Sequence, residues 1–403
     1  IRMSKFKFLF KIDNFLFVNL LLLSFFSYIF LPDFLYKFIN GWTFNEWLIN
    51  YRGGFVRRGL LGELIYYLNK LDLDHRFFIF LIGSISLFHI LYNVLDLIKD
   101  KNILYRIFII FNPFGLFYLV QNIEFFFARR DLFYLNFLIY FGKRKKFNNK
   151  LFFIFSIFLI LNYGIYIFLI ISIFFFIKEK EEFDLKKFKY SFFLLFAPLN
   201  ILLLTIFSNA KNFENLCSSI NLINEKLPLQ EKECWGAPNW VDSNYEPTAR
   251  AFDEISRGIN YINDLYSWII VFIILFLCLF LVVEKNIKFL LKQILYLSPY
   301  YFFFFFAQDW GRWIFLIFFI VFFNYSFSNN IKLNGNNLLY IYIVPILLNI
   351  YINIPTHLFQ NINIVDIVSI DTSTSFLFRY LYNLVLAPYI IVKYGYEPPI
   401  YLE

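Results

Sequence analysis

The stretch Trp268–Val283 reads WIIVFIILFLCLFLVV and contains no charged residue. Phe15–Phe30, Leu151–Ile177 and Trp313–Phe327 are comparably long and almost free of charge. A helix of about 20 apolar residues crosses the ~30 Å hydrocarbon core of a bilayer. In lipid, a helix also satisfies its own backbone hydrogen bonds. These stretches therefore predict transmembrane helices.

The composition of the whole chain supports the same prediction. The 403 residues are 60% hydrophobic and 16% charged, whereas an ordinary soluble domain carries about 25% charged residues. We predict an all-α, polytopic integral membrane protein, a single transmembrane domain over residues 1–403 with about 10–11 transmembrane helices. The expected spans are 14–32, 77–97, 103–121, 124–142, 151–177, 191–207, 267–283, 288–306, 312–327, 338–354 and 375–392.

The charged loops indicate the orientation. Asn162-Tyr163-Gly164 interrupts the span 151–177, which we interpret as a broken helix pair or a re-entrant hairpin. Every strongly basic short loop then falls on one face, which the positive-inside rule makes cytoplasmic. The N-terminus is expected on that face too, since no small-residue cleavage site follows the first apolar run. We predict a multi-pass protein of the cell (inner) membrane, with cytoplasmic loops at 1–13, 98–106, 143–150, 178–190 and 284–292.

Most lysines and most arginines fall on opposite sides of the predicted membrane. Eighteen of the 24 lysines, counting Lys332, lie in the predicted cytoplasmic loops, and ten of the 13 arginines lie on the other face. The planar guanidinium fork binds carboxylate or phosphate through two parallel hydrogen bonds, whereas lysine acts as a point charge. Arginines on the face where topology disfavours cations indicate an anion-binding role. The alternative is that they pair with local acids and hold loops.

The first extracytoplasmic segment, 33–76, has three arginines and four glycines within residues 50–63. They are Arg52, Arg57, Arg58, Gly53, Gly54, Gly59 and Gly62. Glycine lets a backbone approach an anion closely, and Trp42 and Trp47 suit a membrane interface. Residues 56–68 predict a helix lying on the membrane, where a bound anion would offset the unfavourable arginines at its N-terminal end. The alternative is an interfacial helix with snorkelling arginines.

The large extracytoplasmic loop, 208–266, is the longest polar stretch. Cys217 and Cys234 lie within it, and two cysteines in such a loop predict a disulfide bond. Residues 246–257 carry two acid–arginine pairs at i,i+4 spacing. They predict a short surface helix.

Charged residues also stand at the outer ends of two predicted spans. They are Glu124, Arg129, Arg130 and Asp131 in one group, and Asp309 and Arg312, with Trp310 between them, in the other. Ionisable groups near hydrocarbon are costly and face a cavity or a partner, so they are functional candidates. The alternatives are a structural role for the first group and a mutual ion pair between Asp309 and Arg312.

Several kinds of chemistry have no signal in the sequence. No Cys/His cluster, P-loop or glycine-rich nucleotide fingerprint is present, so we predict no metal site, no cofactor and no ATP-driven transport. The net charge of +8 comes from short loops between apolar spans. We therefore expect no nucleic-acid partner.

We hypothesise that the external arginines line one cavity with carboxylates nearby. They would hold the (pyro)phosphate of a polyprenyl-linked sugar, while a carboxylate deprotonates an acceptor hydroxyl. The hypothesis assigns catalysis to Asp309, Glu46 and Arg312. It assigns substrate binding to Arg52, Arg57, Arg58, Glu124, Arg129, Arg130, Asp131 and Trp310. Membrane lipids and other polysaccharide-assembly proteins are the further expected partners.

The arrangement resembles the bacterial O-antigen and capsular polysaccharide polymerases and, more broadly, the GT-C-type membrane glycosyltransferases. The resemblance rests on span number, the two long external segments, and the stretches Tyr51–Gly62, Ala128–Asp131 and Asp309–Arg312. It implies a polyprenyl-pyrophosphate-linked oligosaccharide donor and a lipid-linked glycan acceptor. The chain departs from these families in having neither an Arg-x10-Gly spacing in the late loop nor a paired Asp in the first loop.

Two alternative functions stay open. A GT-C-type transferase of a single sugar to a glycan, lipid or protein would depend on a first-loop carboxylate, for which Glu46 is the candidate. A transporter or flippase of an anionic lipid-linked glycan would need charges along a path through the bilayer and two similar halves. The sequence has neither feature.

Overall fold

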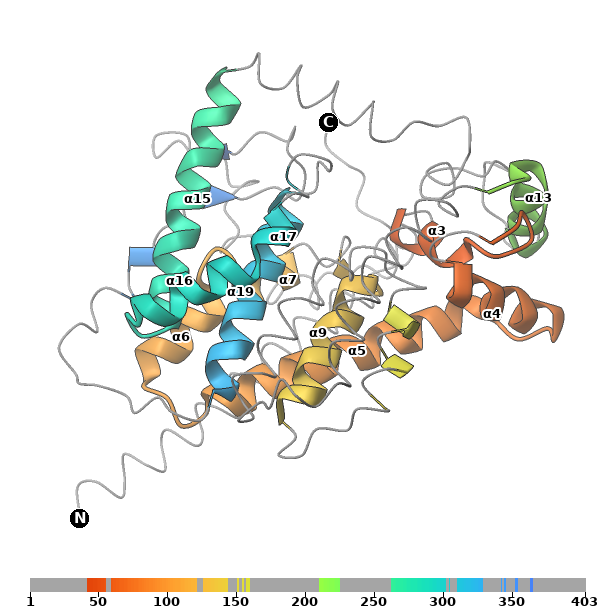
Figure 1. Ribbon diagram of the computed structural model, residues 1–403. Helices are drawn as coiled ribbons and strands as arrows, with labels where there is room; N and C mark the ends of the chain where they lie inside the picture. The colour runs from red at the N-terminus through yellow and green to blue at the C-terminus, as the bar shows by residue number, and fades with distance from the viewer. Residues whose placement is uncertain are drawn as a thin grey trace, which may run out of the picture.

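The computed structural model is mostly helical in the part of the chain that it describes (Figure 1). It describes residues 42–55, 59–121, 126–143, 210–224, 262–301 and 310–328, with short pieces between 151 and 159 and between 304 and 364. Within these residues, β-structure is limited to a two-residue ladder in which β1 (Ile352–Asn353) pairs antiparallel with β2 (Asn363–Ile364). The predicted spans 14–32, 191–207 and 375–392 lie outside the described residues.

The longest described helix is α5 (His75–Ile98), which corresponds to the predicted span 77–97. Asp74 caps its N-terminus, because its side chain accepts a hydrogen bond from the Arg76 amide at 2.9 Å. Among the described helices, α5 alone is both long and apolar enough to cross a bilayer. Two shorter apolar helices, Trp268–Val282 and Gly311–Phe327, correspond to the predicted spans at 267–283 and 312–327.

Exposed apolar side chains follow one stripe on each of three helices, α5, α15 (Ile262–Val282) and α16 (Ile287–Tyr296). The positions recur at helical spacing, so each stripe is a single helix face. A surface helix in water carries polar residues on such a face. The exposed residues are Phe77, Leu81, Ile85 and Tyr92 on α5, Ile269, Ile270, Ile273 and Phe276 on α15, and Ile287, Leu291 and Leu295 on α16.

The core is built around α19 (Trp310–Phe327), in which every residue from 311 to 325 is buried. This helix packs against α15 and against α9 (Arg130–Lys143). Gly142 permits the close approach of α9, because a Cβ added there would lie 2.2 Å from Cδ2 of Phe327. The ends of α9 and α19 therefore lie side by side.

The expectation of one continuous helix over 103–121 was wrong. The chain instead forms α6 (Ile103–Phe111) and α7 (Leu116–Gln121). Pro113 follows directly on Asn112, which takes an extended conformation and ends α6. The Asn112 side chain accepts a hydrogen bond from the Phe114 amide at 2.9 Å. A backbone N–H group between the two helices is therefore hydrogen-bonded.

The predicted span 288–306 is also broken, into α16 and a single turn, α17 (Ser298–Tyr301). Pro299 stands near the start of α17, where its missing N–H is tolerated. In both broken spans, the apolar run suggested continuity and the proline interrupted it.

Lysine-rich loops meet at one end of the helices. Lys143 at the end of α9 contacts Asp96 near the end of α5, with 2.8 Å between Nζ and Oδ2. Lys101, just before α6, contacts Glu284, just after α15, with 2.9 Å between Nζ and Oε1. These ion pairs bring together three of the predicted cytoplasmic loops.

Three shorter helices gather at the other side of the molecule, at the right in Figure 1. They are α3 (Trp42–Leu48), α4 (Gly59–Lys70) and α13 (Phe213–Asn224). Helix α4 corresponds to the helix predicted over residues 56–68, whereas no pattern in the sequence predicts α3 or α13. Helix α4 contacts both of the others, so the first external segment and the large loop lie against each other.

Candidate functional site

A sharp turn before α9 positions the first arginines. Ala128 has φ = 56°, in the left-handed region that residues other than glycine seldom adopt. The Arg129 amide donates to the Phe126 carbonyl at 3.0 Å and closes the turn. As a result α9 begins at Arg130. The predicted start of this helix at residue 124 was therefore wrong.

Helix α3 contacts this turn through two hydrogen bonds. The Trp47 indole N–H donates to the Ala128 carbonyl oxygen at 2.8 Å. Nη2 of Arg130 donates to the backbone carbonyl of Glu46. Trp47 is completely buried, so it packs within the protein. Its indole joins α3 to the start of α9.

Helix α19 supplies the third part of the site. Nε of Arg312 lies 3.4 Å from Oδ2 of Asp131, which makes an ion pair between the first turns of α19 and α9. The guanidinium of Arg312 also lies over the ring of Trp313, 4.1 Å from its centroid. Arg312 thus pairs with an acid far away in the sequence, and its predicted partner Asp309 lies outside the described residues.

We call these charged residues the charged cluster, and all of them are buried. Their exposed fractions are 5% for Glu46, 5% for Arg129, 1% for Arg130, 1% for Asp131 and 9% for Arg312. Removing such groups from water is costly unless partners compensate for the lost hydration. Three guanidinium groups and two carboxylates give the cluster a formal charge of +1. Guanidinium groups bind phosphate and carboxylate oxygens well, so these buried arginines are candidate anion-binding residues.

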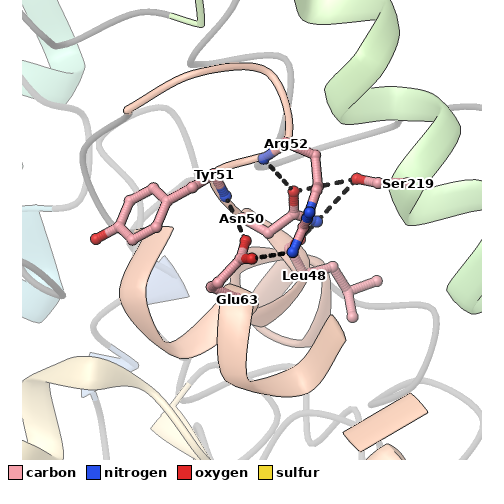
Figure 2. A network of polar contacts seen from close by, with 6 residues as sticks. All are labelled: Leu48, Asn50, Tyr51, Arg52, Glu63 and Ser219. Carbon is pink, nitrogen blue, oxygen red and sulfur yellow. Dashed lines mark hydrogen bonds and ion pairs between the residues drawn. The ribbon is translucent and has the colours of Figure 1, made fainter. Parts of the chain in front are cut away.

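Arg52 belongs to a neighbouring network, shown in Figure 2. Its Nη2 donates to Oε1 of Glu63, and the Tyr51 amide donates to Oε2 of the same carboxylate at 3.0 Å. The guanidinium lies over the ring of Tyr66, 4.2 Å from the centroid. Arg52 thus follows the alternative in which an external arginine pairs with a local acid, and the described contacts do not bring it into the charged cluster.

Three of the four glycines expected to approach an anion have protein in the space that a side chain would fill. An added Cβ would lie 2.4 Å from the Asn212 carbonyl oxygen at Gly53, and 2.2 Å from Cε1 of Tyr51 at Gly59. Gly62 faces a backbone carbonyl even more closely. The expected role was therefore wrong for these three glycines, which allow close packing of the segment.

The large loop is joined to this network by Asn50 and Ser219 (Figure 2). Nδ2 of Asn50 donates to Oγ of Ser219 at 2.9 Å, and Oδ1 of Asn50 accepts from the Arg52 amide at 3.0 Å. The Asn212 amide also donates to the Gly53 carbonyl at 3.0 Å. Helix α13 therefore contributes directly to the shape of the 50–54 turn.

Tyr51 belongs to the Arg52 network, and the charge of Arg130 also acts on it. Burial raises the pKa of its phenol to about 12, against the opposing effect of the Arg130 charge, and Glu63 adds to the rise. Arg130 is thus close enough to act electrostatically on Tyr51. The two groups of charges are neighbours on one side of the molecule.

The predicted site residues therefore divide into three sets. Arg312 pairs with Asp131, Arg129 and Arg130 directly precede Asp131 in the chain, and Arg130 contacts the backbone carbonyl of Glu46. Arg52 lies in the network with Glu63. Outside the described residues lie Arg57, Arg58, Glu124, Asp309, Cys234 and the side chain of Trp310. Cys217 is disulfide-bonded and Cys278 is free and buried. The pairing of Cys217 with Cys234 stays a prediction.

Sequence reasoning did not select Trp47, Asn50, Tyr51 or Ser219 as site residues. Each is uncharged, and each gains its place from a contact with a segment distant in the sequence. Only the position of Tyr51 directly before Arg52 could have drawn attention to it.

Within the described residues, no group of His, Cys, Asp or Glu side chains is arranged to hold a metal ion. Comparison of the chain with protein-family models, with curated proteins and with solved structures gave no match. Function therefore has to be inferred from the chemistry of the site.

Proposed function

We propose that the chain is a multi-pass membrane protein with the charged cluster on its extracytoplasmic side. The apolar stripes on α5, α15 and α16 are the faces that lipid would cover. The lysine contacts join the ends of α5 and α9, whereas the charged cluster lies at the start of α9. The positive-inside rule puts the lysine end in the cytoplasm and therefore the cluster on the other side.

At that site we propose glycosyl transfer from a polyprenyl-(pyro)phosphate-linked sugar, in the manner of a polysaccharide polymerase. The bond between the anomeric carbon and the pyrophosphate oxygen breaks, and this carbon forms a bond to an acceptor hydroxyl oxygen. The hydroxyl proton passes to a carboxylate, and polyprenyl pyrophosphate leaves. The observation that carries this proposal is that Arg129, Arg130 and Arg312 are all buried and that Arg312 pairs with Asp131, the residue that directly follows Arg130.

The charged cluster suggests a role for each of its members. Arg129, Arg130 and Arg312 would stabilise the charge that develops on the leaving pyrophosphate. Asp131 orients Arg312 through their ion pair. Glu46 is the described carboxylate that could accept the acceptor proton, and Asp309 stays a predicted catalytic residue.

The test uses protein reconstituted in liposomes with a synthetic polyprenyl-pyrophosphate oligosaccharide. Wild-type protein should produce longer glycans and release polyprenyl pyrophosphate. Arg130→Lys and Arg312→Lys keep the positive charge but lose the planar fork. Each should lower kcat/KM by about 100-fold, as loss of one transition-state contact does in other enzymes.

Arg76→Lys is the matched control. Arg76 is also expected on the extracytoplasmic side, but it is partly exposed and pairs with Asp74 at 3.1 Å. Its replacement should leave turnover unchanged. A folded wild-type protein without transferase activity would refute the proposal, and full activity of both cluster variants would refute the site assignment.

One observation favours the single-sugar GT-C-type alternative as the second candidate. Glu46, a buried first-loop carboxylate, lies on the segment that contacts Arg130. Under this alternative Glu46→Gln should abolish turnover, and wild-type protein should add one sugar per acceptor. A ladder of products would identify a polymerase instead.

A further inference from the structure

The aromatic ring of Tyr51 is fixed by two close contacts. Gly59 lies directly against it, since a Cβ added there would be 2.2 Å from Cε1 and 2.4 Å from Cδ1 of the ring. Phe55 also stacks on it, with 5.1 Å between ring centroids and 13° between planes. The backbone amide of Tyr51 is held by Glu63. The position of the hydroxyl group is therefore set before any ligand arrives.

The hydroxyl group itself makes no hydrogen bond in the described part of the chain, although its oxygen is buried. Figure 2 shows the side chain pointing away from the network of Asn50, Arg52, Glu63 and Ser219. A buried hydroxyl without a partner costs free energy, so its retention calls for an explanation. The cation that acts on it electrostatically is Arg130, a member of the charged cluster.

We propose that the Tyr51 hydroxyl donates a hydrogen bond to a phosphate oxygen of the substrate that Arg130 holds. Tyr51 would then be a substrate-binding residue, with its fixed ring serving to aim the donor. This inference rests on the proposed function, since it names a residue for the same (pyro)phosphate group. Phosphate oxygens are strong acceptors, and a neutral phenol beside a guanidinium supplies a further donor without adding charge.

The experiment compares wild-type protein with Tyr51→Phe, which removes only the hydroxyl and keeps the ring against Gly59 and Phe55. Binding of geranylgeranyl pyrophosphate to protein in nanodiscs is measured, with inorganic pyrophosphate in a parallel arm. Tyr51→Phe should weaken binding by roughly 10-fold to 100-fold, as loss of a hydrogen bond to a charged group does. Because that hydroxyl has no hydrogen bond in the described part of the chain, the midpoint of thermal unfolding should not fall.

Tyr92→Phe is the matched control. Tyr92 is exposed on the apolar stripe of α5, far along the helix from the site, and its replacement should leave binding unchanged. Weaker binding of both probes by Tyr51→Phe would identify the phosphate group as the recognised part. An effect on the lipid probe alone would identify a lipid headgroup held near the membrane. Either result supports the proposal.

Equal binding by Tyr51→Phe and wild-type protein in both arms overturns the inference, even where wild-type protein elongates glycans. Weakened binding by Tyr51→Phe together with no glycan elongation by wild-type protein leaves the inference standing and refutes the proposed reaction. No binding of either pyrophosphate by wild-type protein overturns both.

Discussion

Ala128 holds a left-handed backbone conformation at φ = 56° while buried beneath α5. Such strain costs of order 1–3 kcal/mol and persists only where the surroundings impose it. Here the carbonyl of Ala128 accepts from the Trp47 indole, and Gly83 of α5 lies against its backbone. The strained turn is what separates the helix α9 from the preceding chain and brings Arg129 and Arg130 to the site.

Gly83→Ala tests this close approach. Glycine to alanine inside a helix ordinarily stabilises by roughly 0.5–1 kcal/mol. At Gly83 the added Cβ would lie 2.8 Å from Cβ and 3.0 Å from Cα of Ala128. We therefore expect the free energy of unfolding to fall by about 1–3 kcal/mol, measured by thermal unfolding in detergent. Ser84→Ala, the adjacent position, should change it by less than about 0.5 kcal/mol. A more stable Gly83→Ala variant would contradict this packing.

Among the elements, α13 has a structural connection that its position in the large loop did not suggest. It reaches the first external segment through Asn50–Ser219 and Gly53–Asn212. Since Asn50 also accepts from the Arg52 amide, the loop helix supports the turn that carries Tyr51 and Arg52. The described parts of these two segments form one structural unit.

A double-mutant cycle measures this connection. Asn50→Ala and Ser219→Ala should each destabilise the protein, and together they should cost less than the sum. We expect a coupling of about 0.5–1.5 kcal/mol, the usual net value of a hydrogen bond. Ser218 is exposed and one residue away, so Asn50→Ala combined with Ser218→Ala should be additive. Additive effects for the Ser219 pair would show that the contact contributes no stability.

For the molecule as a whole, the main feature is that lysines and arginines gather at different ends of the described helices. Lys101, Lys143 and their acids lie at one end of the described helices. The arginines of the charged cluster lie at the start of α9 and α19. In a membrane protein with this arrangement, the positive-inside rule predicts that the end with the charged cluster faces away from the cytoplasm.

Cysteine labelling tests this orientation. Lys211→Cys and Lys288→Cys introduce thiols at exposed positions on the two opposite sides. A membrane-impermeant maleimide should label Lys211→Cys in intact cells, but Lys288→Cys only after permeabilisation. Wild-type protein serves as the control, because Cys278 is buried and Cys217 is disulfide-bonded. Labelling of both variants in intact cells, or of Lys288→Cys alone, is incompatible with the proposed topology.

The helices that could be predicted are those with long apolar runs, because hydrophobic length is a local property of the sequence. Helices α5, α15 and α19 belong to this group. Helices α3 and α13 are short and contain polar residues, so their stability depends on tertiary packing and no local signal marked them. The prolines near the breaks in two predicted spans can be read from the sequence. Whether a helix ends there also depends on hydrogen bonds such as the one that the Asn112 side chain accepts.

The sequence by itself determined the mostly helical architecture of the described chain and the division of lysine from arginine along it. Both follow from composition and spacing. The tertiary structure alone decided which arginine meets which acid, so that Arg312 pairs with Asp131 and Arg52 with Glu63. The physical reason is that an ion pair requires contact within about 4 Å. For Arg312 and Asp131 this contact depends on the packing of α9 against α19, and for Arg52 and Glu63 it depends on how the chain turns back between Tyr51 and α4.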